Sequence, residues 1–296
     1  MNKTNLKFKL VDALFIAMMI IPIVFSIVLK VLTTPAKEGI VISGALIFKT
    51  IKMPIQDFII SESQVNSAMV IISVLFLCLY LTHGIKKGVW LKRHHFAEMI
   101  VEKSTEMVTG NMGDYFRSFA PFIAAILALS AFSSLITLFG LYPPTSDINI
   151  VAGWAILVFI LITYYKMKCG PIEYAKSFAN PALMAPLNII SEVATPISMA
   201  FRHYGNVLSG SVISVLVAAG LQGLSNLIFG ALPGFLGEFP FLRVGIPAIL
   251  SVYFDIFSGV LQAYIFAMLT MLYISGGFPL ELYMKRKEKK HLGAKI

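Results

Sequence analysis

The chain has 296 residues, of which 57% are hydrophobic and only 13% are charged, and its mean hydropathy is +0.82. Soluble domains are close to half apolar and about a quarter charged, so this composition excludes an ordinary water-soluble protein. The formal net charge of +9 does not indicate a nucleic-acid partner, because lysine and arginine collect in the cytoplasmic loops of membrane proteins. The composition therefore predicts an integral membrane protein.

Six apolar runs are long enough to cross a hydrocarbon core, which takes about 20 helical residues. They cover residues 10–32, 66–85, 119–140, 150–167, 181–229 and 244–276. The fold class expected from them is an all-α membrane protein, a polytopic helical bundle with about six membrane segments.

The run 181–229 is too long for one upright crossing. At about 1.5 Å per residue it would make a helix on the order of 70 Å long, more than twice a hydrocarbon core of about 30 Å. It must tilt strongly, lie nearly flat or break. Places where it could bend are Pro186, Pro196, Gly205, Gly210, Gly220 and Gly223.

A basic start followed by the apolar run 10–32 is also typical of a signal peptide. The run is longer than the apolar region of such a peptide, roughly 7–15 residues, and no small-x-small site follows before Thr33, Thr34 and Pro35. We expect an uncleaved anchor helix in an N-terminal extension, 1–40, ahead of the main domain, 41–296.

Positive charge is concentrated in alternate segments. The basic stretches are 3–9, 86–93, 166–176 and 285–295, whereas 33–65, 141–149 and 230–243 are balanced or poor in cations. With six crossings every basic stretch falls on one side, so the positive-inside rule places both termini in the cytoplasm.

The polar segment that follows the second run predicts an amphipathic helix on the membrane surface. Phe96, Ile100 and Met107 stand at near-helical spacing in it. We expect His94 and His95 to be interfacial side chains, because no partner stands at metal-ligand spacing. The chain also has no nucleotide-binding or hydrolase motif, so we expect no cofactor, no metal and no catalytic site.

The polar residues inside the last two runs are the candidates for function. A charge at the centre of a membrane helix costs about 2.5–3.5 kcal/mol even on a lenient scale, so Arg202 is the foremost of them. Helical spacing places Ser198, Gly205, Asn206 and Ser209 on its face. Small residues on that face would let another helix approach closely.

The run 244–276 has a similar face. Asp255, Ser258, Gly259 and Gln262 follow one another at helical steps, and Thr270 extends the row. Two consecutive helices thus present a permanent cation and an acid, which favours an ion path along Asp255, Gln262, Asn206 and Ser211.

Three alternatives compete with this interpretation. Arg202 could pair with Asp255 or Glu192 as a buried structural bridge, although such bridges add little stability. A secondary transporter with an intramembrane Arg/Asp site would carry inverted repeats, and no such symmetry relates 1–148 to 149–296. A receptor or scaffold would not need polar faces on two consecutive helices.

Two stretches together resemble a known family. They are "PLNIISEVATPISMAFRHYGNVLSG", 186–210, and "GVLQAYIFAMLTMLYIS", 259–275. They are similar to subunit a of the F-type ATP synthase, the stationary membrane subunit beside the rotating c-ring. The stretch "PPTSDINIVAGWAILVFILITYY", 143–165, resembles the same family, and the resemblance covers roughly residues 55–280.

The resemblance implies roles for single residues. Arg202 matches the arginine that faces the c-ring carboxylates, Asn206 and Gln262 match its polar companions, and Glu192 matches an acid near the cytoplasmic exit.

This sequence departs from the family pattern at three positions. Many members have an acid at the position of Ser211 and a histidine or small residue at that of Asp255, so the outer acid has moved to the facing helix. His203 replaces the commoner leucine, and we expect it to pack or hydrogen-bond rather than to line a channel.

The resemblance also implies a fold and partners. The last two long helices would form a tilted, near-horizontal hairpin beside the c-ring. The chain would be a non-catalytic, multi-pass subunit of the bacterial cell membrane, embedded in lipid. It would contact the c-ring and a b-type peripheral stalk and carry H+ or Na+ through two offset half-channels.

Overall fold

The computed structural model describes residues 3–34, 44–54, 57–85, 88, 91–178, 184–230, 242, 245, 247, 249–250, 252–278, 280 and 283–284. This part of the chain contains six helices long and apolar enough to cross a membrane, by length and composition. They are Phe8–Thr33, Glu62–Thr82, Asp114–Phe139, Ile148–Lys168, Ala185–Phe229 and Val252–Gly276. The predicted all-α polytopic membrane fold is confirmed.

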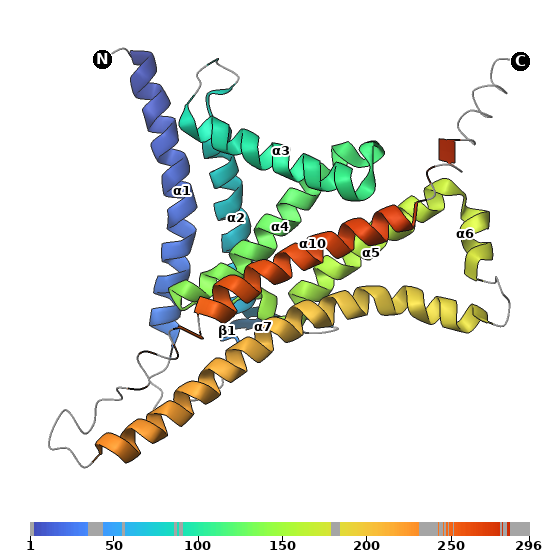
Figure 1. Ribbon diagram of the computed structural model, residues 1–296. Coiled ribbons are helices and arrows are strands. Elements are labelled where there is room, and N and C mark those ends of the chain that lie inside the picture. The colour runs from blue at the N-terminus through green and yellow to red at the C-terminus, as the bar shows by residue number, and fades with distance from the viewer. Residues whose placement is uncertain are drawn as a thin grey trace, which may run out of the picture.

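The first two long helices, α1 (Lys3–Thr33) and α2 (Glu62–Thr82), lie side by side, as Figure 1 shows. Before α2 the chain forms a small antiparallel hairpin of β1 (Ile47–Ile51) and β2 (Phe58–Ser61), which the sequence analysis did not predict. The proposed boundary at residue 40 lies outside the described residues, so the division into 1–40 and 41–296 stays a prediction.

Ion pairs hold α1 at both of its ends. Near its start, Asp12 lies 2.9 Å from Arg93 and 2.7 Å from His83. Near its end, Lys30 Nζ lies 2.9 Å from Glu62 Oε1, and the Glu62 side chain is only 3% exposed. A buried carboxylate is stable only when it is paired, so α1 supplies the cation that Glu62 needs.

Helix α3 (Lys92–Met112) confirms the predicted helix after the second run, but His94 does not lie where the sequence analysis put it. It is 1% exposed. Its Nδ1 accepts from the Leu91 N–H at 3.2 Å, and its Nε2 donates to the His83 carbonyl at 3.0 Å. The interfacial assignment of His94 was wrong because two backbone groups between α2 and α3 satisfy its ring; His95 is exposed, as expected.

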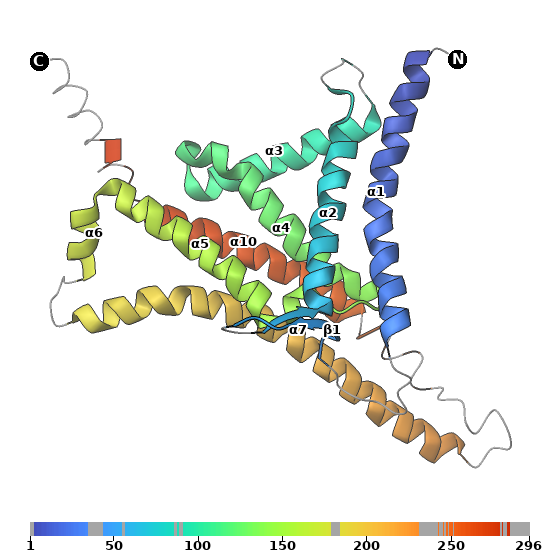
Figure 2. The same cartoon turned by 180° about the vertical axis from the view of Figure 1, so that it is seen from behind.

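Four further helices surround the core. They are α4 (Ala120–Leu135), α5 (Ile148–Cys169), α7 (Ala185–Phe229) and α10 (Gly259–Gly276). The end of α3 joins them, and the buried residues include Val108, Ile123, Val158, Met199 and Phe266. The short α6 (Pro171–Phe178) lies between the end of α5 and the start of α7 in the view from behind (Figure 2).

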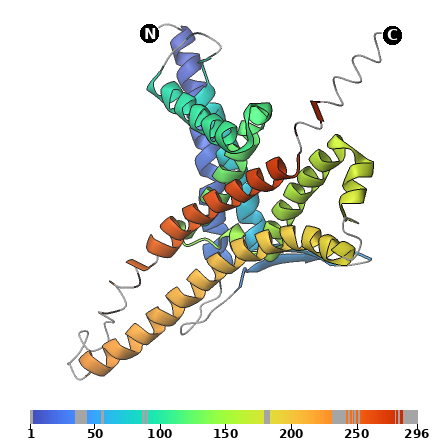
Figure 3. The same ribbon diagram turned by 45° about the vertical axis from the view of Figure 1, so that its right-hand side comes forward.

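Helix α7 is one continuous helix of 45 residues with Pro196 inside it. It curves smoothly and lies strongly inclined to α1 and α2 (Figures 1 and 3). The length of this run left three options, which were a strong tilt, a nearly flat position or a break. Helix α7 tilts and does not break.

The last helix runs antiparallel to α7, which agrees with the expected hairpin (Figure 3). Its first part, Val252–Ser258, is π-helical, and α10 continues from Gly259. The predicted start of this run at residue 244 lies outside the described residues.

We expect Lys30→Met to lower the free energy of unfolding by roughly 1–3 kcal/mol, because the buried Glu62 loses its cation. Thermal unfolding in detergent measures this. The double variant Lys30→Met/Glu62→Gln should recover most of the loss, and Lys52→Met, at an exposed lysine after β1, should change nothing. A single variant as stable as the wild type would contradict the pairing.

Candidate functional site

Arg202 lies on α7 with its side chain exposed. Within the described part of the chain it has no hydrogen bond and no ion pair. The side of the helix next to Arg202 is buried, with Met199 2% and His203 0% exposed. A bridge from Arg202 to Glu192 is excluded, since Glu192 is paired with Lys166 instead.

The face of α7 that carries Arg202 is also lined by small residues with free space beside them. A Cβ added at Gly205, Gly220 or Gly223 would meet no described atom within 4 Å apart from the backbone of its own helix and its chain neighbours. Gly220 and Gly223 follow Arg202 and Gly205 after about five turns, so they lie on the same face. This open face would let another helix approach the backbone of α7 closely.

Asn206 and Gln262 lie close together, as a path past both side chains would require. The Asn206 Nδ2 donates to Gln262 Oε1 at 3.4 Å, and the Ser258 Oγ donates to Asn206 Oδ1 at 3.2 Å. Gln262 is only 3% exposed. Polar side chains thus link α7 to the last helix one turn from Arg202, in a place where an unpaired amide would be costly.

Only the part of the predicted polar face from Gly259 onward lies in an α-helix. Asp255 lies in the π-helical segment Val252–Ser258. Its steps to Gln262 were counted with α-helical spacing, which a π-helix with i→i+5 bonds does not follow. The structure does not describe the Asp255 side chain, so its place in an ion path stays a prediction.

Ser211 does not join this group. It is exposed, and its Oγ donates to the Val207 carbonyl of its own helix at 3.0 Å.

His203 is a buried packing residue in this structure. Its ring meets Trp154 at 6.1 Å and Phe266 at 5.5 Å, both edge to face. Its Nε2 lies 3.3 Å from the Ser130 Oγ, and its Nδ1 has no hydrogen-bond partner among the residues that the structure describes. The expectation that it packs or hydrogen-bonds agrees with these contacts.

A row of buried hydroxyl groups was missed by the sequence analysis. Ser130, Ser133 and Ser134 on α4 and Thr145 in the short 3₁₀-helix Pro144–Ser146 are each at most 2% exposed. The Ser134 Oγ lies 3.5 Å from the Thr145 Oγ1 and donates to the Ser130 carbonyl at 3.3 Å. The spacing of the three serines, at steps of three and four, was the signal that could have revealed a single polar helix face.

The row of hydroxyls leads toward a polar cluster at the β-hairpin end of the bundle. There the Ser63 hydroxyl donates to Asp147, and Asn66 Nδ2 donates to the Tyr142 carbonyl at 2.9 Å. Burial raises the pKa of Tyr142, and Tyr204 and then the carboxylates of Asp147 and Glu62 raise it further, so its hydroxyl stays protonated.

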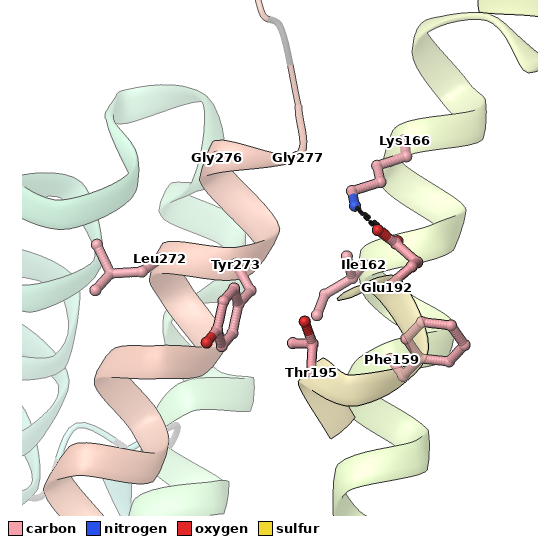
Figure 4. A pocket seen from close by; sticks show the side chains of 9 residues that line it. All are labelled: Phe159, Ile162, Lys166, Glu192, Thr195, Leu272, Tyr273, Gly276 and Gly277. Atoms are coloured by element: carbon pink, nitrogen blue, oxygen red, sulfur yellow. Dashed lines mark hydrogen bonds and ion pairs between the residues drawn. The ribbon is translucent and has the colours of Figure 1, made fainter. Parts of the chain in front are cut away.

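Glu192 lies at the other end of the site, about 15 Å along the α7 axis from Arg202. The Lys166 Nζ contacts both carboxylate oxygens, at 2.7 and 2.8 Å, and the Tyr174 hydroxyl donates to one of them at 3.2 Å. Figure 4 shows this pair at the edge of a cavity of about 200 Å³ between α5, α7 and α10. The cavity walls include Thr195, Tyr273 and Gly277.

We expect Gly259→Ala to destabilise the protein by roughly 1–3 kcal/mol, because α4 and α10 would have to separate. A Cβ at Gly259 would lie 2.6 Å from the Ser134 Cβ. Thermal unfolding measures the loss, and Ser134→Gly in the same chain should relieve it. Gly220→Ala, with open space beside it, is the matched control; an equal effect of both alanines would overturn the close contact.

The sequence similarity to known proteins covers the helices from α2 to α10. The sequence model of a family described as "ATP synthase A chain" matches residues 64–275. A "subunit a" of ATP synthase from Trichlorobacter lovleyi is 29% identical over 230 residues, 73% of this chain and 89% of the relative. An "ATP synthase subunit a 3" from Pelobacter propionicus is 31% identical over 222 residues, 73% of this chain and 87% of the relative.

Proposed function

Because the chain belongs to the ATP synthase A chain family, the ion-translocating membrane subunit of ATP synthase, we propose that it forms the stationary side of the ion path. Arg202 would face the carboxylates of a rotating c-ring, and two offset half-channels would connect that ring to the two sides of the membrane. The observation that carries this proposal is the exposed Arg202, which has no hydrogen-bond or ion-pair partner among the described residues and lies on an open helix face.

Arg202 is suited to meet a carboxylate that belongs to another subunit. Its guanidinium stays charged, and no acid within the described residues neutralises it. A cation at this place lowers the pKa of an acid that comes near, so a passing c-ring carboxylate would release its ion there.

The open face beside Arg202 supports the same partner. No side chain lies within 4 Å of the Cβ positions of Gly205, Gly220 and Gly223. A row of helices passing along α7 could therefore come close to its backbone, as small residues permit in membranes.

The polar groups on the two sides of Arg202 support two separate paths. On the side of the β-hairpin we propose an outer half-channel past Thr145, Ser134, Asn206 and Gln262, with Asp255 and Ser211 as further polar groups of the path. On the other side we propose an inner half-channel that ends at Glu192. Arg202 lies between them, and its charge repels a cation that would cross directly.

This arrangement converts ion flow into rotation. An ion from the outer half-channel neutralises a c-ring carboxylate, which then turns into lipid, because a neutral group is far cheaper there than a charged one. After nearly a full turn the ion leaves through the inner half-channel. Each charge that moves through 100 mV supplies about 2.3 kcal/mol, so several ions are needed to drive ATP synthesis elsewhere in the complex.

The wider assembly is part of the proposal. We propose a bacterial cell membrane as the location, both termini in the cytoplasm, H+ or Na+ as the ion and a b-type peripheral stalk as a second partner. The secondary transporter considered from the sequence has no support in the family match.

We expect Arg202→Ala to abolish ATP-driven ion pumping in membrane vesicles, because a c-ring carboxylate would no longer meet a cation between the half-channels. Arg117→Ala removes an exposed arginine from outside the site and should leave pumping intact. Coupled pumping that survives in Arg202→Ala vesicles would refute the stator assignment.

We expect Asp255→Asn to slow ion flux by roughly tenfold or more, since the outer path would lose its titratable acid. Passive flux through the membrane part under an imposed potential measures this. Introducing an acid on the facing helix with Ser211→Glu should restore part of the flux, and Asp114→Asn is the control. Unchanged flux in Asp255→Asn would make Asp255 a structural residue.

A further inference from the structure

The contact between Lys166 and Glu192 occupies the place that an ion leaving the protein would need. The Lys166 ammonium lies 2.7 and 2.8 Å from the two oxygens of Glu192, so both oxygens already face a cation. The pair borders the cavity between α5, α7 and α10 (Figure 4). On the basis of the function proposed above, this carboxylate is the last acid of the inner half-channel.

We propose that Lys166 is a tethered cation that blocks the inner half-channel by occupying Glu192, and that each ion must displace it to leave. In this role Lys166 is a positioning residue that acts through Glu192. A free cation that approaches the pair meets a carboxylate already neutralised and a like charge beside it. Lys166 therefore slows the last step of ion release.

The ion pair between Lys166 and Glu192 is weak enough for a passing ion to displace the lysine. The side chains of Lys166 and Glu192 are 23% and 19% exposed, so water reaches both. Partly exposed ion pairs are weak, and the long lysine side chain can swing into water at low cost. The Lys166 Nζ also lies 5.8 Å from the centre of the Tyr174 ring, which helps to hold it over the carboxylate.

Tyr174 keeps the acid in place when the lysine leaves. Its hydroxyl donates to Glu192 at 3.2 Å. Burial first, and the Glu192 carboxylate second, raise the pKa of Tyr174, so the hydroxyl remains a donor. Glu192 thus stays oriented toward the cavity without Lys166.

A glycine makes room for the lysine. A Cβ at Gly277 would lie 2.8 Å from Lys166 Cε and 3.1 Å from its Cγ. The backbone of Gly277 has a φ of −80°, which any residue adopts. The Lys166 side chain, together with the Tyr273 carbonyl oxygen 3.1 Å from the same Cβ position, leaves little room for a side chain at 277. Gly277→Ala would push the ammonium away without changing its charge.

The test is passive ion flux through the complex in membrane vesicles stripped of the water-soluble part of the ATP synthase. A potassium diffusion potential drives the flux, which a pH-sensitive dye reports for protons and radioactive sodium reports for Na+. Immunoblots of the vesicles correct each rate for the amount of assembled complex. Lys166→Gln should raise the rate by about 1.5-fold to fivefold, the range expected from releasing one partly exposed ion pair.

Three further variants separate a block from a structural bridge. Lys166→Arg should restore the slow rate, and Gly277→Ala should raise it as Lys166→Gln does. The double variant Lys166→Gln/Glu192→Gln should be as slow as Glu192→Gln alone, because Lys166 acts only through that carboxylate. Lys168→Gln removes a cation that contacts Tyr115 instead of Glu192, and the rate should not change.

A rate that stays equal or falls in Lys166→Gln, while Glu192→Gln is slow and Arg202→Ala abolishes coupling, would overturn the block and leave the proposed function standing. A general charge effect would appear as acceleration in Lys168→Gln as well, and it would also overturn the block. Failure of the proposed function is a different result, in which Arg202→Ala and Glu192→Gln leave coupled pumping unchanged.

Discussion

Hydrocarbon offers no hydrogen bonds, and this constraint governs where the polar side chains of this protein lie. Asn206 bonds to Gln262 across two helices, and Glu62 is paired with Lys30. Each such contact fixes one helix against another. Arg202 departs from this rule, since the described residues leave it exposed and without a partner. Under the function proposed above, the partner of this charge would be a carboxylate of a neighbouring subunit.

Much of the fold could be predicted from the sequence because length and hydropathy are strong signals in a membrane. The six long helices and the inclined α7 follow from runs that are apolar over at least a hydrocarbon thickness. Arg202, Asn206 and Gln262 stood out because polar residues are costly in such runs. The two polar faces placed Asn206 and Gln262 along one path, and the hydrogen bond between them is known only from the structure.

What the sequence did not predict depends on contacts between distant segments. His94 is buried because its ring forms hydrogen bonds with the backbone of residues 83 and 91. Helical periodicity in the sequence does not indicate these contacts. The partner of Glu192 comes from α5, and the row of serines on α4 looks apolar in a hydropathy average. The departure of Val252–Ser258 from α-helical geometry changes which residues share a face with Gln262.

That π-helical segment has a consequence for how this family can gain and lose residues. A π-turn holds one residue more than an α-turn, so deletion of a single residue within Val252–Ser258 could be absorbed as the segment returns to α-helix. The same deletion between Gly259 and Gln262 would rotate everything beyond it by about 100° and carry Gln262 away from α7. Insertions and deletions among relatives should therefore gather in the seven residues before Gly259.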